Sequence, residues 1–268
     1  MKINQVKRAL KAGKPQFGSW LSLASVAAAR YMAHAGYPWL TVDMEHSHAD
    51  IHTAALMFAT IADAGCVPIA RVPAGKHEWI KMALDSGAMG IVAPMVMDAD
   101  EARAIVAATK YPPVGNRSVG GGLHALNFGA TADEYYSKAN DEILVIIQAE
   151  HIDTLDRLDE IYSVPGLDAV FVGPNDLGYS MRSADGEFPS KERFEDALAR
   201  IVKAAKRNNL PSGIHTPNVE AALKRASEGF QFIAVGSELK LMLDGAARVV
   251  SLTNPKGEAE DLPDLAKY

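Results

Sequence analysis

Residues 143–176, which read ILVIIQAEHIDTLDRLDEIYSVPGLDAVFVGPND, decide the fold. Two short apolar runs, 143–148 and 168–172, flank a segment whose apolar residues have helical spacing, 154–162. Neither run alternates polar with apolar residues, and such runs are typical of parallel strands that are covered on both faces. The stretch therefore predicts a strand–helix–strand unit of a parallel sheet.

Similar units recur along the chain. Further strand candidates lie at 17–23, 39–43, 67–72, 90–96, 212–215 and 230–235. Further helical patterns lie at 25–35, 50–64, 77–86, 98–109, 191–208 and 218–227. Eight strands that alternate with helices predict an α/β fold, a (β/α)8 TIM barrel, formed by residues 1–268 as a single domain. The alternative is an open doubly wound sheet, but no glycine-rich dinucleotide-binding motif follows the first strand.

Two segments depart from this pattern. Residues 112–132 contain Gly120, Gly121 and Gly122 in a row and predict a long loop or a lid. The residues from about 254 onward combine proline, glycine and acidic side chains. They predict a solvated tail or a segment devoted to subunit contacts.

The composition is that of a soluble globular protein, with 48% hydrophobic and 22% charged residues. The net charge of −6 contains no long run of one sign, so neither nucleic acid nor an anionic membrane is expected as a partner. No apolar stretch is long enough to span a bilayer. Cys66 is the single cysteine, and its apolar surroundings predict a buried, unreactive thiol. A cytoplasmic location fits these features best.

Polar residues gather where the predicted strands end. In a parallel barrel these carboxyl-terminal ends form one rim, and the active site lies there. In chain order the strand ends carry Asp43-Met44-Glu45-His46, Arg71, Gln148-Ala149-Glu150, Gly173-Pro174-Asn175-Asp176 and His215-Thr216. Five strands thus bring acidic, basic and amide groups to the same rim, which predicts a catalytic site.

Two carboxylates, Glu150 and Asp176, follow neighbouring strands on this rim. They can meet a hard cation such as Mg²⁺ or Mn²⁺ and leave room for water and substrate oxygens. The alternative is that Glu150 caps the next helix and that Asp176 forms a turn with Gly173 and Pro174. A zinc cluster is not expected, because the single cysteine has no partner.

A candidate base and a candidate anion-binding group share the rim. His46 follows Asp43 within one turn, and an imidazole oriented by a carboxylate is the usual general base near neutral pH. The alternative is that His46 caps the junction between strand and loop. Arg71 closes an apolar strand, and its anionic partner is either a structural acid or a carboxylate of the substrate. Together these residues indicate a small, anionic, carbonyl-bearing substrate.

Six segments resemble the HpcH/HpaI aldolases, which are metal-dependent class II aldolases of 2-keto acids. They are VDMEH (42–46), ARVP (70–73), DSGAMGIVAPMV (85–96), YPPVGNR (111–117), QAE (148–150) and VFVGPNDL (170–177). The resemblance runs from Phe17 to Leu243, and the order of the six motifs makes it specific. It implies cleavage of a 4-hydroxy-2-keto acid through a metal-bound enolate. The products would be an aldehyde and pyruvate, or a pyruvate-like keto acid.

The resemblance also implies roles for single residues. Glu150 and Asp176 match the two carboxylates that hold a divalent metal, Mg²⁺, Mn²⁺ or Co²⁺. Arg71 matches the arginine that contacts the keto acid. His46, with Asp43 behind it, matches the histidine that transfers a proton through water. Three further positions match residues on the substrate side of the family's site: Gln148, Gly173 and Asn175.

The expected partners are a keto acid, an aldehyde and further copies of the chain. The family typically forms homo-oligomers, hexamers or trimers, and exchanges the C-terminal helix between subunits. The sequence departs from the commoner family pattern at three places: 118–127, Ala149 and Glu238. These departures leave open the length of the substrate and the identity of the acceptor aldehyde, but they do not affect the metal centre. Three alternatives remain: an oxaloacetate decarboxylase or macrophomate-synthase-like enzyme, a lyase of coenzyme A thioesters, and a binding barrel without activity. A lyase of coenzyme A thioesters would need a cluster of basic residues on the rim to bind the nucleotide phosphates, and no such cluster is evident. The presence of Glu150, Asp176, Arg71 and His46 argues against a barrel without activity.

Overall fold

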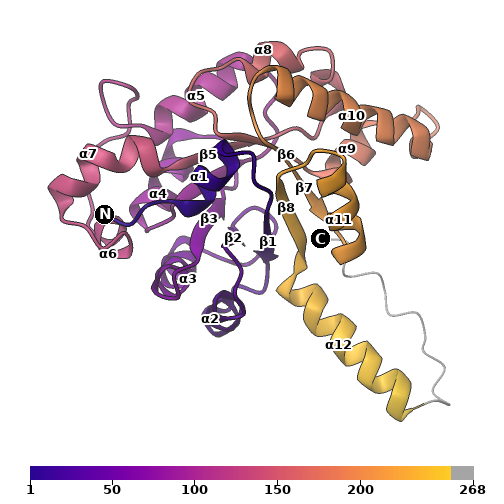
Figure 1. The fold of residues 1–268 in the computed structure, drawn as a ribbon, viewed down its shortest axis with the longest axis horizontal. Helices are drawn as coiled ribbons and strands as arrows, with labels where there is room; N and C mark the ends of the chain where they lie inside the picture. The colour runs from indigo at the N-terminus through magenta and orange to yellow at the C-terminus, as the bar shows by residue number, and fades with distance from the viewer. Residues whose placement is uncertain (255–268) are drawn as a thin grey trace.

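The computed structural model describes residues 1–254 and contains a closed barrel of eight parallel strands. The strands follow one another in chain order, and the last pairs with the first to close the barrel (Figure 1). Their bounds are β1 Gln16–Leu21, β2 Trp39–Asp43, β3 Val67–Arg71, β4 Gly90–Ala93, β5 Leu144–Gln148, β6 Ala169–Val172, β7 Ser212–Thr216 and β8 Phe232–Ser237. The predicted TIM barrel is confirmed.

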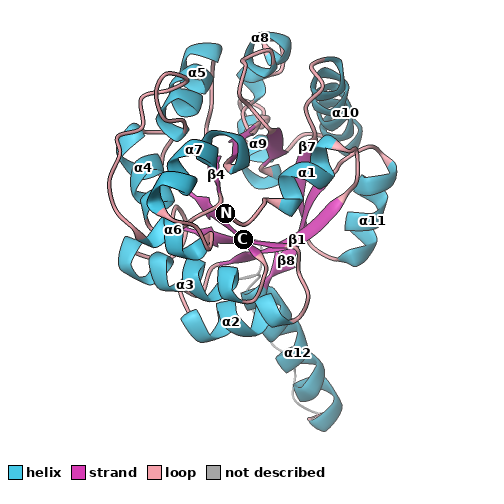
Figure 2. Ribbon diagram, turned by 60° about the vertical axis from the view of Figure 1, so that its left-hand side comes forward, coloured by secondary structure: helices cyan, strands magenta, loops and turns pink. Residues whose placement is uncertain are grey.

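Helices surround the barrel (Figure 2). Their bounds are α1 Gln5–Lys11, α2 Val26–His34, α3 Ile51–Asp63, α4 His77–Asp85, α5 Ala99–Thr109, α6 Leu123–Asn127, α7 Ala132–Glu142, α8 Leu158–Tyr162, α9 Pro174–Ser180, α10 Lys191–Arg207, α11 Val219–Ser227 and α12 Glu238–Thr253, with a 3-10 turn η1 at Ile152–Thr154. Several begin where the sequence predicts, because Ser25, Asp50 and Asp98 accept the N–H hydrogen bonds that cap a helix.

The predicted strands differ from the observed ones at their ends. β4 stops at Ala93 and not at residue 96, because Pro94 has no N–H to donate and Met95 adopts a φ of 52°. β8 begins at Phe232, two residues later than predicted. These shifts leave the predicted rim residues at or shortly after the ends of their strands.

The predicted loop at 112–132 contains the short helix α6 and lies toward the end of the barrel opposite the rim. The chain reaches it through α5, which runs away from the rim. Arg117 of this segment binds Asp85, the last residue of α4, with 2.7 Å between Nη2 and Oδ1. A Cβ on Gly121 would lie 3.8 Å from the Cβ of Asp85. The segment therefore does not form a lid over the rim of its own barrel, and that prediction is wrong.

Aromatic side chains fill the barrel, and a glycine makes room for them. Trp39 of β2 stacks on Phe232 of β8 with 4.0 Å between the ring centroids. A Cβ on Gly18 of β1 would lie 2.2 Å from the Trp39 ring, so only glycine fits at this position. Nearer the rim, Trp20 of β1 stacks on Phe171 of β6 at 5.1 Å. The interior is thus a packed core and not a pore.

Helix α12 projects from the barrel instead of packing on it (Figure 1). Of its residues only Glu238 is buried. Five of its large apolar side chains are exposed: Leu241, Met242, Val249, Val250 and Leu252. The tail predicted from about residue 254 lies outside the described residues, apart from Asn254 itself.

Cys66 lies immediately before β3 and is buried, as predicted. Burial raises the pKa of its thiol to about 12, so the reactive thiolate is negligible at neutral pH. Within residues 1–254, none of the helices has the length and apolar character needed to cross a membrane.

Candidate active site

Neighbouring strands bring the predicted site residues to one rim of the barrel. Asp43 and Arg71 end β2 and β3 and are paired in register. Gln148 ends β5, and Glu150 follows it by two residues. Asp176 lies in the first turn of α9, directly after β6. The topology therefore gathers the acids, the arginine and the amide as the sequence predicts.

Glu150 is buried on this rim, with 3% of its surface exposed. Its Oε1 accepts the backbone N–H of Met95 at 2.7 Å, and its Oε2 accepts a hydrogen bond from Nε2 of Gln148 at 2.6 Å. Burial raises the pKa of Glu150 to about 8, and the negative charges of Asp176 and Glu45 act in the same direction. Glu150 does not cap the segment that follows, because His151 caps η1.

Gly173 lies directly against this carboxylate. A Cβ at position 173 would lie 2.1 Å from Oε2 of Glu150 and 3.1 Å from Nε2 of Gln148, so any side chain would collide with the site. Asn175 follows in the first turn of α9 and is exposed, as is Asp176. The wall of the site beside Glu150 is therefore made of backbone and small polar groups.

The donor set fits a hard divalent cation. A cation between Glu150 and Asp176 would offset the repulsion and the burial that raise the pKa of Glu150. The buried Oε1 of Gln148 has no hydrogen-bond partner and is a further oxygen on the same wall. Within residues 1–254 no three His, Cys, Asp or Glu side chains are placed to hold a metal alone. Two carboxylates suit Mg²⁺, which keeps water or substrate oxygens as its other ligands.

Asp43 binds the guanidinium of Arg71 and not the imidazole of His46. Both of its oxygens contact Arg71, with 2.9 Å between Nε and Oδ1. Oδ1 also accepts the backbone N–H groups of Glu45 at 3.0 Å and of His46 at 3.1 Å. The structure thus differs from the predicted side-chain pair, because the tight turn after β2 directs amides, and not the imidazole, at Asp43.

Glu45, to which the sequence analysis assigns no role, links His46 to Arg71. Its Oε1 lies 3.8 Å from Nε2 of His46, whose side chain is 50% exposed. Its Oε2 lies 3.3 Å from Nη1 of Arg71. Burial raises the pKa of Glu45, and the positive charges of Arg71 and His46 act against that shift. The imidazole therefore has a carboxylate neighbour, but a different one from the predicted one.

Trp20 is a second rim residue that the sequence analysis misses. The guanidinium carbon of Arg71 lies 5.7 Å from the centroid of its ring. The edge of the ring contacts His215 at 5.9 Å between centroids. Burial lowers the pKa of His215 to about 4, and its Nε2 lies 3.1 Å from the carbonyl oxygen of Gly236, so this histidine is neutral at pH 7. An aromatic residue in an apolar strand is also typical of core packing, so the sequence carries no distinct signal for Trp20.

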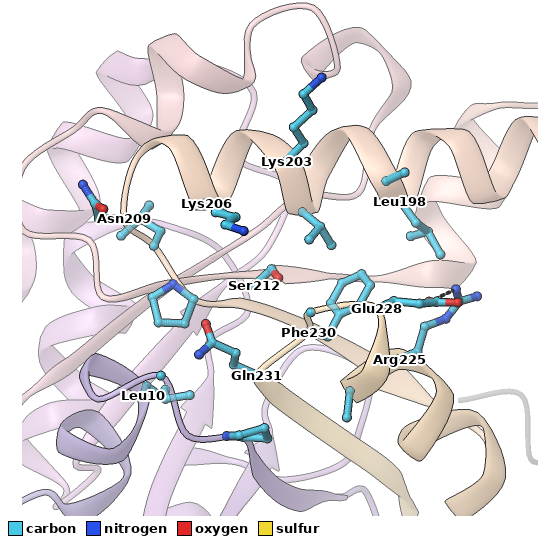
Figure 3. A pocket seen from close by; sticks show the side chains of 18 of the residues that line it. Leu10, Leu198, Lys203, Lys206, Asn209, Ser212, Arg225, Glu228, Phe230 and Gln231 are labelled. Atoms are coloured by element: carbon cyan, nitrogen blue, oxygen red, sulfur yellow. Dashed lines mark hydrogen bonds and ion pairs between the residues drawn. The ribbon is translucent and has the colours of Figure 1, made fainter.

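Two cavities differ in their relation to this rim. One of about 370 Å³ opens beside the site and has Glu45 and Met95 on its wall. A larger one of about 1140 Å³ lies at the opposite end of the barrel, between α10 and the residues that precede β1, β7 and β8 (Figure 3). None of the predicted site residues lines the larger cavity. None of them lines the smaller cavity either, but Glu45 and Met95 on its wall contact Arg71 and Glu150, so this cavity adjoins the rim at which chemistry is expected.

Comparison with known proteins agrees with this geometry. Residues 16–245 match the family model described as HpcH/HpaI aldolase/citrate lyase. A hydroxypyruvate/pyruvate aldolase from Deinococcus radiodurans is 36% identical over 97% of this chain and 94% of its own. A 4-hydroxy-2-oxo-heptane-1,7-dioate aldolase from Escherichia coli is 35% identical over 91% of this chain and 92% of its own. The crystal structure of an HpcH/HpaI aldolase/citrate lyase family protein from Burkholderia cenocepacia superposes with a TM-score of 0.86 and 33% identity, over 93% of this chain and 99% of the other.

Proposed function

Because the chain belongs to the HpcH/HpaI aldolase/citrate lyase family, we propose that it is a pyruvate-type class II aldolase. It cleaves a 4-hydroxy-2-keto acid into an aldehyde and pyruvate, or a pyruvate-like keto acid, and it catalyses the reverse addition. The observation that carries this proposal is the buried Glu150 beside Asp176, with the cationic Arg71 on the same rim. Release of pyruvate from such a keto acid, with and without Mg²⁺ or Mn²⁺, tests it.

The metal centre of the proposal consists of Glu150 and Asp176. The family is generally dependent on a divalent metal, and we propose Mg²⁺, Mn²⁺ or Co²⁺ for this chain. When bound, the cation supplies Lewis acidity that stabilises negative charge on the keto oxygen. Gln148 holds Oε2 of Glu150 at 2.6 Å and the amide of Met95 holds Oε1 at 2.7 Å, so the carboxylate is oriented before a cation arrives.

Arg71 binds the keto acid in this scheme. Its guanidinium is anchored by Asp43 and lies near the face of Trp20, so it is held in one orientation. Its positive charge stabilises the oxyanion that develops when the carbon–carbon bond breaks. Gly173 and Asn175 border the place where the carboxylate of the keto acid binds. Gly173 has this role because a side chain would fill the space.

His46 takes the proton in the direction of cleavage. Its half-exposed imidazole removes the proton of the 4-hydroxyl, directly or through water, while Glu45 steadies the ring from 3.8 Å. The bond between C3 and C4 then breaks, the aldehyde leaves, and the resulting enolate takes up a proton at C3 to give pyruvate. Asp43 acts through Arg71 and through the backbone of the turn that carries His46, which makes it a positioning residue.

The proposal extends to assembly and location. We propose that the chain is a single domain that forms a homo-oligomer, a hexamer or a trimer, in which α12 packs on a neighbouring subunit. The exposed apolar residues of α12, such as Val249 and Val250, support this exchange, because they have no cover within residues 1–254 of their own chain. A cytoplasmic location belongs to the same proposal and is supported by the single buried cysteine.

A further inference from the structure

The cavity of about 1140 Å³ at the end of the barrel opposite the rim has no role in the scheme above. It lies between α10, the end of α1 and the segments that lead into β7 and β8, and we call it the basal cavity (Figure 3). We propose that the basal cavity is a binding site for an organic anion with an apolar body, and that Lys206 pairs with the anionic group. The proposed site is independent of the aldolase function, because the two sites lie at opposite ends of the barrel.

Part of the wall of the basal cavity is apolar. Val202 of α10 and Leu210 are half-buried residues of the lining, and the buried Leu198 and Phe230 continue this surface into the core. A volume of about 1140 Å³ is above the usual range of sites for small molecules, which is about 300–1000 Å³. The cavity therefore has room for a ligand with two rings or a long hydrocarbon chain, and burial of that body removes apolar surface from water.

Each acidic residue in the lining has a cationic partner. Oδ2 of Asp168 lies 2.9 Å from Nζ of Lys7, which is outside the lining. Glu195 and Glu228 both accept hydrogen bonds from Nη1 of Arg225, at 2.6 Å and 2.7 Å. The negative charges on the wall are therefore compensated within the protein.

The lysines of the lining are not compensated in this way. They are Lys11, Lys203 and Lys206, and within residues 1–254 none of their ammonium groups has a hydrogen bond or an ion pair. In Figure 3, Lys203 points away from the cavity, whereas Lys206 lies on the side of α10 that faces Ser212 and Gln231. An anion in the cavity would gain a charge-assisted hydrogen bond with Lys206.

Neutral hydrogen-bonding groups lie on the wall that Lys206 faces. Ser212 is only 3% exposed, and its hydroxyl makes no hydrogen bond with the described part of the chain. The side-chain amide of Gln231 makes none with residues 1–254 either. Because a buried polar group without a partner is costly, an oxygen of the ligand that bonds to Ser212 would favour binding further.

The experiment titrates the full chain, loaded with metal, with two fluorescent probes that share one skeleton. The first, 8-anilino-1-naphthalenesulfonate, carries a sulfonate, and the second, N-phenyl-1-naphthylamine, lacks it. Lys206→Met is measured against Lys206→Arg, which keeps the charge. Lys191→Met removes a lysine from the first position of α10, outside the cavity, and is the matched control.

Lys206→Met should raise the Kd of the sulfonate about fivefold and change the Kd of the neutral probe less than about twofold, as expected for the loss of one partly exposed charge contact. Lys206→Arg should keep the affinity of the wild type, and Lys191→Met should leave both values unchanged. Sulfonate bound to other apolar surfaces, such as α12, would not respond to Lys206, so equal Kd values in the wild type and Lys206→Met would overturn the proposal. No saturable binding of the sulfonate by the wild type, or an equal loss of affinity for both probes in Lys206→Met, would also overturn it.

Discussion

Asp43 accepts hydrogen bonds from the guanidinium of Arg71 through both carboxylate oxygens, with 2.9 Å between Nε of Arg71 and Oδ1. The two residues end neighbouring strands in register, so the barrel itself sets the distance between them. Nη1 of Arg71 is left facing Glu45 at 3.3 Å, and the guanidinium lies over Trp20. Arg71 is therefore fixed in orientation before any substrate binds, which is the condition for efficient charge stabilisation.

Replacing Asp43 by Asn should weaken binding of the keto acid. Asn keeps the shape but loses the charge that holds Arg71, so the KM for the keto acid should rise about tenfold, equivalent to about 1.4 kcal/mol. The kcat should fall by a smaller factor. Steady-state kinetics measures the changes in KM and kcat separately. Asp63→Asn, at the far end of α3, is the control. A fall in kcat alone, with a displaced pH profile, would instead make Asp43 the partner of the His46 imidazole.

The metal-free protein should lose stability as the pH rises from 6.5 to 8. The pKa of Glu150 is raised from 4.5 to about 8 in the folded chain, so the folded state retains a proton that the unfolded chain has released. The free energy of unfolding then falls by at most about 1.4 kcal/mol for each pH unit. Two other groups make the protein more stable as the pH rises, but outside this range. The pKa of His215 is lowered from 6.5 to about 4, so its effect lies below pH 6.5. The pKa of Lys110 is lowered from 10.5 to about 8, so its effect lies above pH 8.

Urea unfolding of the metal-free protein at pH 6.5, 7.2 and 8.0 measures this slope. The Glu150→Gln variant is the control, since its amide does not titrate. The account predicts a slope in the wild type that the variant lacks. The same slope in both proteins would assign the pH dependence to other groups.

Replacing Trp20 should separate packing from contact with Arg71. Trp20→Ala leaves a cavity beside Phe171 and should destabilise the fold by about 3–5 kcal/mol. Trp20→Phe keeps most of the packing but offers a weaker ring to the guanidinium, so it should retain a cooperative unfolding transition and raise the KM for the keto acid several-fold. Unfolding curves together with kinetics check both variants. An unchanged KM in Trp20→Phe would limit Trp20 to a role in packing.

Charged residues on α12 should dissociate the assembly. Val249 and Val250 are 60% and 57% exposed on the isolated chain. A double change to Glu at these positions would place two charges in the proposed interface, where burial without a partner is costly. Light scattering after size exclusion should show an oligomer for the wild type and for the control Ser251→Glu, and a smaller species for the double variant. A wild-type monomer would contradict the exchange of α12.

The architecture could be predicted from the sequence because the strands are covered on both faces and therefore stand out as apolar runs. Runs such as 143–148 contain no polar residue at alternate positions, and eight of them spaced by helices close into a barrel in few ways. Their ends were harder to predict. β4 stops early because of Pro94 and the left-handed backbone of Met95, and only the proline is visible in the sequence.

The identity of the rim residues could be predicted, but their pairing could not. Parallel strands place Glu150, Asp176, Arg71 and Asp43 at one end of the barrel, whatever the details of the turns. Which group faces Asp43 depends on the conformation of three residues after β2, and there the amides of Glu45 and His46 prevail over the imidazole. The direction of the segment 112–132 depends on the length and course of α5 in the same way.

The most direct test of the account is the release of pyruvate from a 4-hydroxy-2-keto acid by four samples. They are the wild type as purified, the wild type after a chelator, the chelated protein with Mg²⁺ or Mn²⁺ restored, and Glu150→Gln with the same ions. The account predicts turnover in the first and third samples only, because Glu150 and Asp176 hold the cation on which the reaction depends. Undiminished pyruvate release by the chelated protein, or by Glu150→Gln, would contradict it.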